Sequence, residues 1–167
     1  MTTHARPPRQ ERLDTAQATP RIAIVGSGFA GIGMAIQLRR MGVETFTIYE
    51  AAGSLGGTWR DNAYPGAACD IPSHLYSFSF EPNPDWTRTY APQREILDYL
   101  RHCAHKYDVD RYIAYRSRVS AASFDAARSV WVIEIERDGV MHTTEADLLI
   151  AANGPLSRPA LPAVEGL

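Results

Sequence analysis

The chain has 167 residues, enough for one domain with a core of ordinary size. Hydrophobic residues make up 45% and charged residues 22% of it, as in most globular proteins. The 17 basic residues against 19 acidic ones give a net charge of -2, which argues against nucleic acid or an anionic membrane as the main partner. No run approaches the roughly 18 apolar residues of a membrane span, and residues 1–20 lack the apolar core of a signal peptide. We therefore expect a cytoplasmic protein with a disordered lead-in over residues 1–20.

The cysteine and histidine residues do not indicate a metal site. Cys69 and Cys103 lie far apart without CxxC or histidine-rich spacing, so neither a disulfide framework nor a zinc site is predicted. His102 and His105 lie three residues apart in a predicted helix, but with no third ligand nearby a solvated helix face is the better interpretation.

The most informative stretch is a strand, a tight turn and a helix over residues 22–38. Four apolar residues run into Gly26-Ser27-Gly28-Phe29-Ala30-Gly31, and a helical apolar period continues to a stop at Gly42. Gly26 permits a sharp turn, Gly28 lets the backbone approach a pyrophosphate, and Gly31 lets helix and strand pack closely. The phosphates would then face the free N–H groups, including those of Phe29 and Ala30, at the positive end of the helix.

A GxGxxG string alone is weak evidence, because glycines recur in ordinary turns. Here a second predicted strand, Thr45 to Tyr49, ends in Glu50, nineteen residues after Gly31. An acid in that place accepts hydrogen bonds from ribose hydroxyls and repels a 2′-phosphate. The site is therefore predicted to hold FAD or NAD and to disfavour NADP.

A second glycine-containing loop, residues 51–59, follows the acid. Gly56 and Gly57 precede Thr58 and Trp59, a combination that suits close backbone approach to a flat ligand. The alternative is a solvent loop with one core tryptophan. Because the loop lies downstream of an acid-terminated strand, it favours FAD over NAD.

Residues 60–92 show no sustained period and carry five prolines and six aromatic side chains. Long irregular stretches in compact domains are usually functional or disordered, and the aromatic residues argue against disorder. We predict an ordered loop over a site, with a possible short strand or helical turn near Leu75 to Phe80. A helix should open at Pro92 to Glu95 and close near Tyr107, with apolar residues at spacings of three and four.

The last third of the chain is predicted to be mostly β. Four short segments read as a β-meander, with turns at Asp125-Ala126 and Asp138-Gly139. The segments are Tyr112 to Tyr115, Val119 to Phe124, Trp131 to Glu136 and His142 to Asp147. Leu148 to Ala152 then reads as a buried parallel strand that stops at Asn153-Gly154-Pro155. The predicted fold class is therefore α/β and Rossmann-like, with the domain over residues 21–155 and a linker over residues 156–167.

From about Arg21 onward the chain resembles the N-terminal FAD-binding part of a Baeyer-Villiger monooxygenase, within the flavin monooxygenase class. The most specific features are GGTW at 56–59 and NAYPGAACDIPSHLYSFSF at 62–80. The resemblance implies a glutathione-reductase-type FAD-binding domain that is incomplete at its C-terminus. The linker would lead toward an NADPH-binding domain, and the family's signature motif should begin just after Leu167.

The resemblance also implies an activity. NADPH reduces the flavin, O2 reacts with it, and one oxygen atom is inserted into a ketone to give an ester or lactone. The implied cofactors are FAD and NADPH, with the NADPH site largely outside this chain. The implied partners are a small ketone, O2 and possibly the remaining C-terminal portion, with no nucleic acid or membrane.

Roles for single residues follow from the same resemblance. Gly26, Gly28 and Gly31 would line the pyrophosphate, and Glu50 would hold the adenosine ribose. Asp70 matches an acid beside the flavin, where it faces an arginine that supports the oxygenated flavin; it is the candidate catalytic residue. A carboxylate in such an aromatic pocket also needs a cation on physical grounds, the alternative being a loop-capping aspartate before Ile71-Pro72. The remaining predicted cofactor contacts are Phe29, Ala30, Gly57, Thr58, Trp59, Tyr76, Val119 and Gly154.

Two other functions remain open from the sequence. The chain could be a stand-alone FAD- or NAD-binding module without catalysis. It could also come from a flavin monooxygenase that oxygenates nitrogen or sulfur, since the two groups differ in their signatures after Leu167.

Overall fold

The computed structural model describes residues 19–155, 163, 164 and 166. The lead-in predicted for residues 1–20 and the linker predicted for residues 156–167 therefore lie almost wholly outside the described residues. Within the described part, no helix is both long and apolar enough to cross a membrane.

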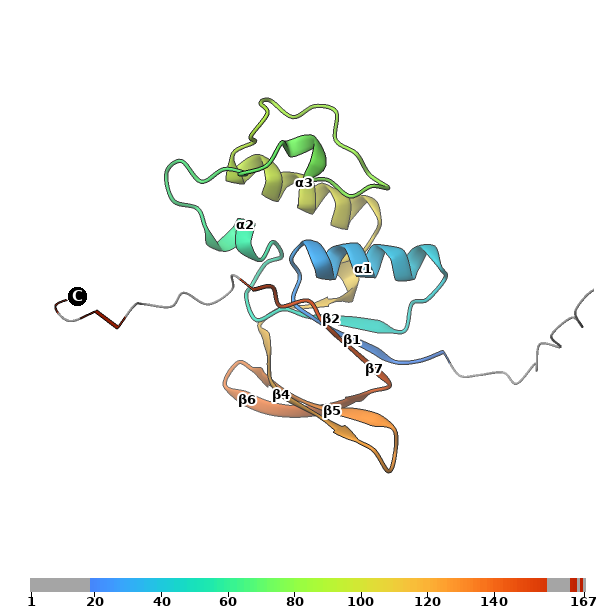
Figure 1. Cartoon of the computed structure of the whole chain (residues 1–167). Coiled ribbons are helices and arrows are strands. Elements are labelled where there is room, and N and C mark those ends of the chain that lie inside the picture. The colour runs from blue at the N-terminus through green and yellow to red at the C-terminus, as the bar shows by residue number, and fades with distance from the viewer. Residues whose placement is uncertain (1–18, 156–162, 165, 167) are drawn as a thin grey trace, which may run out of the picture.

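Three layers stack on one another (Figure 1). A parallel sheet lies in the middle, with α1 (Phe29–Arg40) and α3 (Gln93–Lys106) on one face and an antiparallel meander on the other. This is the predicted Rossmann-like α/β arrangement, and both long helices begin and end within two residues of where the sequence placed them.

The four-stranded parallel sheet has the order β3-β2-β1-β7. Its strands are β1 (Ile22–Val25), β2 (Phe46–Tyr49), β3 (Ile113–Ala114) and β7 (Leu148–Ala151). Ile24 at the centre of β1 is in register with Ile48 of β2 and with Ile150 of β7. The predicted parallel strand at 148–152 is confirmed, but as an edge strand it leaves Leu148 49% exposed rather than buried.

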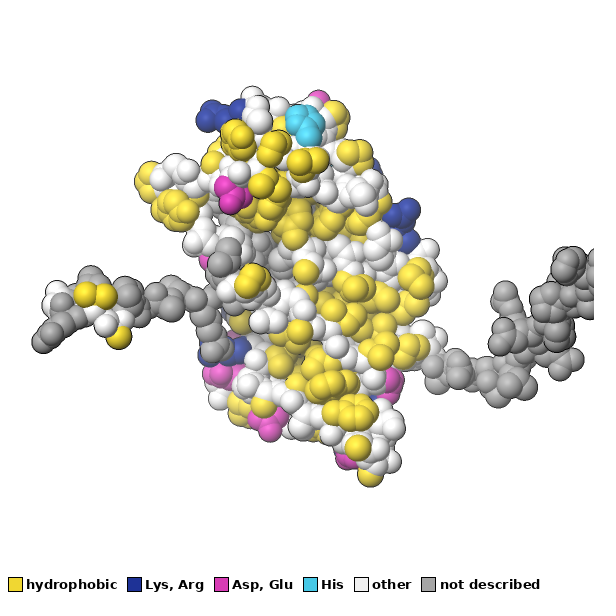
Figure 2. All heavy atoms as spheres, in the orientation of Figure 1, with side chains coloured by type: hydrophobic (Ala, Val, Ile, Leu, Met, Phe, Trp, Pro, Cys, Tyr) yellow, Lys and Arg dark blue, Asp and Glu magenta, His cyan; other side chains and the backbone are white. Residues whose placement is uncertain are grey.

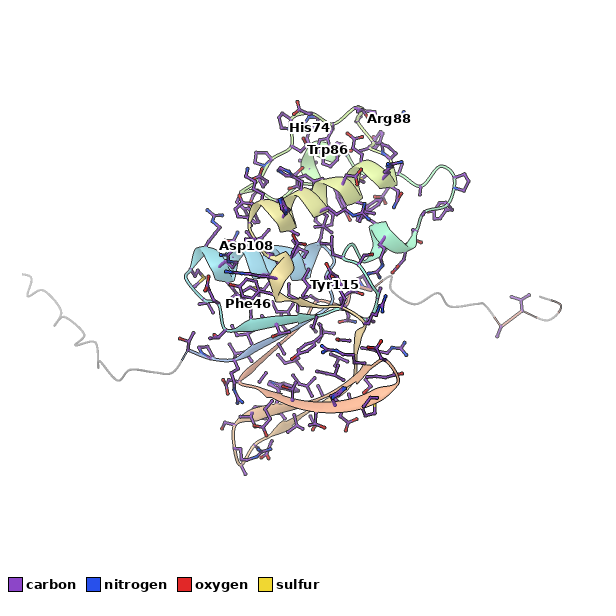
Figure 3. The ribbon with its side chains drawn as sticks, turned by 180° about the vertical axis from the view of Figure 1, so that it is seen from behind. Phe46, His74, Trp86, Arg88, Asp108 and Tyr115 are labelled. Atoms are coloured by element: carbon purple, nitrogen blue, oxygen red, sulfur yellow. The ribbon has the colours of Figure 1, made fainter. Side chains whose placement is uncertain are left out.

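One strand belongs to a different sheet from the one predicted. The segment at Tyr112 to Tyr115 was expected to start the meander, whereas β3 pairs in parallel with β2. The Tyr112 ring stacks on Phe46 at a centroid distance of 4.3 Å, and the N–H of Glu50 donates to the Ala114 carbonyl at 3.0 Å. Phe46 and Tyr115 lie at this edge of the sheet in Figure 3. Packing against Phe46, which lies remote in sequence, therefore decided the pairing.

The meander has the order β4-β5-β6, with β4 (Ser117–Asp125), β5 (Val130–Arg137) and β6 (Val140–Ala146). Both predicted turns are present. Asp138 and Gly139 have φ values of 49° and 77° and form a two-residue turn between β5 and β6, the conformation that Asp-Gly favours. At the other turn, the Asp125 carboxylate accepts hydrogen bonds from the backbone N–H groups of Ala127 and Arg128.

The parallel sheet is buried on both faces, which explains why its strands are apolar runs. On β1, Ile22 and Ile24 pack into the larger core under the helices. Between them, Ala23 packs on the other side against Ile133 and Ile135 of β5. The alternation along one strand therefore joins all three layers.

The segment between α2 and α3 is ordered, as predicted, and it covers α3. The short helix α2 (Thr58–Asp61) precedes it and the 3-10 turn η1 (Ser73–Leu75) interrupts it; the sequence predicted only a possible helical turn or strand near residues 75–80. Ser73 is fully buried, and its hydroxyl accepts the N–H of Ala91 at 2.7 Å. Figure 3 shows His74, Trp86 and Arg88 on this loop above α3; Trp86 is buried against Tyr99.

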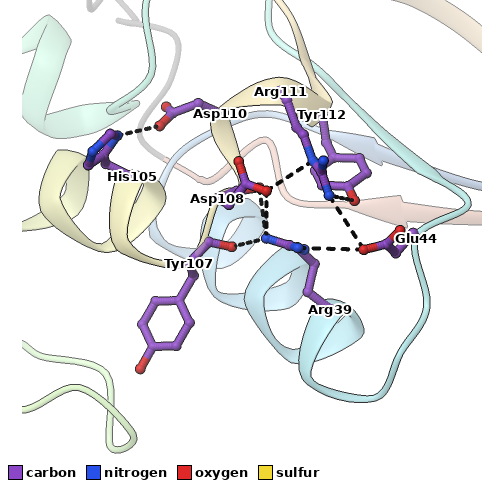
Figure 4. Close-up of polar contacts among 8 residues, drawn as sticks. All are labelled: Arg39, Glu44, His105, Tyr107, Asp108, Asp110, Arg111 and Tyr112. Atoms are coloured by element: carbon purple, nitrogen blue, oxygen red, sulfur yellow. Dashed lines mark hydrogen bonds and ion pairs between the residues drawn. The ribbon is translucent and has the colours of Figure 1, made fainter.

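A polar cluster fastens the end of α1 to the end of α3 (Figure 4). Nη1 of Arg39 donates to the carbonyl oxygens of Tyr107 and Asp108 at 2.5 and 3.0 Å. Nε of Arg111 pairs with the side-chain carboxylate of Asp108 at 3.1 Å. These contacts satisfy the carbonyls of Tyr107, the C-cap residue of α3, and of Asp108 just beyond it, so the end of α1 is tied to the end of α3.

Candidate functional site

A cavity of about 1130 Å³ opens at the carboxyl ends of β1, β2 and β7. This is the place where open parallel α/β sheets bind ligands. Its lining contains most of the residues predicted as cofactor contacts: Gly26, Gly28, Phe29, Ala30, Glu50, Gly57, Thr58, Trp59, Tyr76, Val119 and Gly154. Gly31 and Asp70 do not line it.

The first glycine turn needs each of its glycines for a separate geometric reason. Gly26 has a φ of 99°, and a Cβ there would lie 2.8 Å from the Ala152 carbonyl oxygen. A Cβ on Gly31 would lie 1.9 Å from the Gly26 oxygen, which explains how Gly31 matters without touching the cavity. A Cβ on Gly28 would meet only Gly57, at 3.7 Å, so Gly28 keeps backbone open to a ligand.

Helix α1 points its N-terminus into the cavity. Gly28 is its N-cap residue, no side chain in the described part of the chain caps it, and the first turn carries no acid. The N–H groups at the start of a helix have no partner within the helix and carry the positive end of its dipole. Because Gly28, Phe29 and Ala30 line the cavity, these donors face a space that an anion can enter.

Glu50 lies beside the glycine turn, as the sequence predicted, and only 5% of it is exposed. One carboxylate oxygen, Oε2, accepts the N–H and the hydroxyl of Ser27 at 3.0 and 2.6 Å. The other, Oε1, accepts the N–H of Ala52 at 2.8 Å and lies 3.0 Å from Nη1 of Arg60. A carboxylate has about four acceptor positions, and these four donors match them. Glu50 lines the cavity, so a ribose hydroxyl that reached Oε1 would share it with Ala52 and Arg60.

The second glycine loop packs directly on the first. The N–H of Gly56 donates to the Ser27 carbonyl at 3.0 Å. Gly57 has a φ of 52°, and a Cβ there would lie 3.1 Å from the Gly28 Cα. The two loops thus form one surface of bare backbone at the mouth of the cavity.

Aromatic side chains form an apolar wall next to these loops. The indole N–H of Trp59 donates to the Tyr76 hydroxyl at 3.0 Å, and the two rings meet edge to face at 5.4 Å. Phe29 meets Tyr76 in the same manner at 4.9 Å. Burial raises the pKa of Tyr76, so its phenol stays neutral near pH 7. A flat conjugated ring is the kind of ligand such a wall accommodates.

Asp70 is exposed rather than enclosed, contrary to the expectation of a carboxylate in an aromatic pocket. Its neighbour Cys69 is buried and donates its N–H to the Ala91 carbonyl at 2.9 Å. Because neighbouring side chains in an extended segment point to opposite sides, Ala68 and Asp70 both face outward. No ion pair joins Asp70 to a cation within the described residues.

The sequence did not identify several residues of the cavity. Ser27 and Arg60 hold Glu50, while Arg116, Arg118 and Glu136 come from the meander side. A buried acid requires a cation, which was the available signal for Arg60. Apart from Val119, which the family resemblance implied, no sequence signal places these meander residues next to the glycine turn, because that contact spans about ninety residues of chain.

The cysteine and histidine side chains lie outside this cavity. Cys69 and Cys103 are buried and free, and burial raises the pKa of the Cys103 thiol. His102 and His105 have side chains that are 61% and 93% exposed, as the solvated-face interpretation expects. Within the described residues, no group of three or more His, Cys, Asp or Glu side chains is arranged to hold a metal ion.

The fold and the cavity together define a Rossmann-like nucleotide-binding domain. A family model described as an NAD(P)-binding Rossmann-like domain matches residues 24–92. Two curated relatives, both Baeyer-Villiger monooxygenases, cover 88% of this chain. The relative from Streptomyces coelicolor is 48% identical over 147 residues and that from Pseudomonas aeruginosa is 44% identical over 147 residues.

Solved structures show the same likeness. Oxidized steroid monooxygenase bound to NADP has a TM-score of 0.79 and 38% identity over 90% of this chain. Cyclohexanone monooxygenase from Rhodococcus sp. Phi1 bound to NADP+ has a TM-score of 0.79 and 32% identity over 89% of it. A complex of OTEMO with FAD and NADP has a TM-score of 0.79 and 28% identity over 89% of it.

The matched region is limited to a part of each relative. This chain spans 28% and 27% of the two bacterial relatives and 29%, 28% and 28% of the three solved structures. The predicted resemblance to the N-terminal part of Baeyer-Villiger monooxygenases is confirmed by sequence and by structure.

Proposed function

We propose that this chain binds FAD and is the N-terminal FAD-binding segment of a flavin-dependent monooxygenase of the Baeyer-Villiger type. The observation that carries the proposal is the single cavity in which the start of α1, both glycine loops and Glu50 meet. FAD binding is also the use that fits the relatives, one of which is a complex with FAD and NADP. The whole activity would use NADPH and O2 to oxygenate a small ketone.

The residues present suit a dinucleotide. Bare backbone at Gly28 and Gly57, together with the free donors at the start of α1, suits a diphosphate. The Glu50 carboxylate lines the cavity, where it suits a ribose hydroxyl, and its charge disfavours a 2′-phosphate. Thr58, Trp59 and Tyr76 would lie toward the flavin, with Val119 toward the adenine.

This chain's own contribution is to bind and orient the cofactor. When bound, FAD would supply the ring that accepts a hydride from NADPH and activates O2. The apolar wall of Phe29, Trp59 and Tyr76 would exclude water from one side of that ring. Fixed backbone donors would neutralise the diphosphate without reorganisation, so the ring would be held in one place.

Titration of the purified chain with FAD tests the proposal. We expect saturable binding of one FAD per chain, seen as quenching of flavin fluorescence, and competition by ADP. Gly28→Val should abolish binding, because its side chain would occupy the space left for the diphosphate. A chain that is folded by circular dichroism and binds neither FAD nor ADP contradicts the proposal.

The oxygenation step is tested in a complete enzyme that carries this sequence as its N-terminal part. Ketone-dependent oxidation of NADPH with formation of the ester supports the Baeyer-Villiger reaction. Oxygenation of an amine or a sulfide without conversion of ketones would assign the alternative flavin monooxygenase reaction.

Asp70 is proposed to act in oxygenation rather than in FAD binding. Its exposure and its place outside the cavity lining support a role that begins only when further protein covers it. In a complete enzyme, Asp70→Ala should lower ester formation per bound flavin while the flavin content stays unchanged. Loss of flavin with normal oxygenation per bound flavin would contradict this role.

A narrower function, nucleotide binding without catalysis, is supported by the same cavity. It predicts stable binding of FAD and no ketone-dependent NADPH oxidation by the chain alone. The absorbance spectrum of the purified protein and a turnover assay distinguish the two functions.

A further inference from the structure

We propose that Arg60 is a positioning residue for the nucleotide, because its fixed guanidinium holds the Glu50 carboxylate in place at the site proposed for the adenosine ribose. The inference rests on the proposed function and deepens it. It assigns to Arg60, which the sequence did not single out, part of the preference for a ribose with free hydroxyl groups.

The Arg60 guanidinium lies at the centre of a small charged network. Nη1 lies 3.0 Å from Oε1 of Glu50 and donates to the Ser54 carbonyl at 2.6 Å. Nε and Nη2 donate to the two carboxylate oxygens of Asp61 at 2.8 and 3.0 Å. The guanidinium is thus fixed on two sides by Ser54 and Asp61, and its remaining side faces Glu50.

Burial makes this contact important for Glu50. Its side chain is 7% exposed, and that of Arg60 is 19% exposed. Burying a charged group is costly unless a partner of opposite charge and hydrogen bonds replace its hydration. Ser27 and Ala52 supply three hydrogen bonds, and within the described residues Arg60 supplies the ion pair.

The pair is arranged so that a ligand can still reach the acid. Nη1 carries two N–H groups, so it can donate to the Ser54 carbonyl and also contact Oε1 of Glu50. Glu50 and Arg60 both line the cavity. A ribose hydroxyl that donates to Oε1 would therefore bind beside the arginine.

The same arginine connects the two glycine loops. The backbone N–H of Arg60 donates to the Gly57 carbonyl at 3.0 Å, and a Cβ on Gly56 would lie 2.9 Å from the Arg60 Cβ. Glu50 in turn is bonded to Ser27 in the first loop. The ion pair therefore sets the distance between the ribose site and the bare backbone that faces the diphosphate.

Binding of ADP and 2′-deoxy-ADP, each measured by competition with FAD, tests the assignment. Arg60→Met keeps much of the side-chain volume and removes the charge. We expect it to weaken ADP binding about tenfold, the size of one charge-assisted contact, and to weaken 2′-deoxy-ADP binding much less. Arg60→Lys should restore part of the preference for ADP, because the charge returns without the planar fork.

A double-mutant cycle with Glu50→Gln shows whether Arg60 acts through the acid. In the Glu50→Gln background, Arg60→Met should cause no further loss of ADP binding. Arg128→Met is the matched control, since Arg128 also pairs with two carboxylates, Asp125 and Glu145, but lies outside the cavity lining. It should leave both nucleotide affinities unchanged.

Three outcomes overturn the assignment. The first is a preference for ADP over 2′-deoxy-ADP that Arg60→Met leaves unchanged. The second is an equal loss of affinity for both nucleotides, which means a role in the fold or at the diphosphate. The third is that the losses of ADP affinity caused by Arg60→Met and Glu50→Gln add up in the double variant. If Arg60→Met does not fold, Arg60→Lys takes its place. The assignment is then overturned when the preference of Arg60→Lys for ADP over 2′-deoxy-ADP is as low as that of Glu50→Gln. If the wild-type chain binds neither FAD nor ADP, the proposed function itself is wrong.

Discussion

Single residues of this protein line the cavity, shape the packing around it, or do both. Gly31 lies outside the cavity, yet no other residue fits there, because the start of α1 crosses the Gly26 carbonyl. Glu50 combines both purposes, since it ties down Ser27 and lines the cavity. Substitutions in these two classes should therefore differ in what they change.

Gly31→Ala should destabilise the chain by about 1–3 kcal/mol, the usual cost of overpacking, because its Cβ would lie 1.9 Å from a backbone oxygen that cannot rotate away. The free energy of unfolding in urea measures this. Gly53→Ala is the control, since a Cβ there meets only the Arg116 side chain at 3.8 Å. Equal stability of the Gly31→Ala and Gly53→Ala variants would contradict the packing argument.

Glu81 should make stability depend on acid pH. The hydrogen bond from Lys106, at 2.7 Å, lowers the pKa of Glu81, and the Tyr107 hydroxyl adds a second at 2.8 Å. A carboxyl whose folded pKa is lowered contributes stability above its ordinary pKa and loses it as the pH falls through the folded value. We expect Glu81→Gln to flatten the fall in unfolding free energy below about pH 5. Identical pH profiles of the two proteins would sink this prediction.

At the scale of elements, α3 organises the long loop as well as the core. Tyr99, which is 6% exposed, accepts the N–H of Phe78 at 2.8 Å and donates its hydroxyl to the Glu81 carbonyl at 2.7 Å. Ser73 fixes the other end of the loop through Thr89 and Ala91. An irregular segment stays ordered in this way because its backbone groups bond to side chains instead of to a ladder.

Tyr99→Phe should destabilise the chain by about 1–3 kcal/mol, because it removes the partner of the part-buried Phe78 N–H and of the Glu81 carbonyl. The loop should also become more sensitive to limited proteolysis between η1 and α3. Tyr90→Phe in the same loop is the control, since Tyr90 is 51% exposed. If the loop of Tyr99→Phe resists proteolysis as well as that of the wild-type chain, the Tyr99 hydroxyl does not hold the loop in place.

The elements themselves were largely predictable, and their partners were not. Hydrophobic periodicity and turn-forming residues identified β1, α1, β2, α3 and the meander hairpins, because those signals are local. The same signals placed the segment at Ile113–Ala114 in the wrong sheet, since stacking of Tyr112 on Phe46 joins residues far apart in the chain. They also missed α2, a helix of four residues that is too short to show a period.

At the scale of the whole molecule, the parallel sheet ends in β7, an apolar edge strand. In the described part of the chain β7 pairs only with β1. Figure 2 shows apolar side chains gathered on the face that carries α1 and β7. Met34 of α1 is 40% exposed and Leu148 of β7 is 49% exposed. An exposed apolar edge is a template for pairing with another strand.

We therefore expect the chain to self-associate as its concentration rises, and Leu148→Lys to reduce this by placing a charge on the edge. Sedimentation velocity over a concentration series measures it. Met41→Lys is the control, because Met41 is 76% exposed but lies at the end of α1, away from any strand. Association that persists equally in Leu148→Lys would exclude the β7 edge as its cause.

The sequence alone determined the strand, turn and helix around Gly28, the acid at the end of β2 and the aromatic loop, because each depends on neighbours a few residues away. The tertiary structure alone decided that Gly57 meets Gly28, that Arg60 faces Glu50 and that Asp70 points outward. Those arrangements depend on how separate segments pack against one another. Burial and charge pairing arise only once the chain has folded.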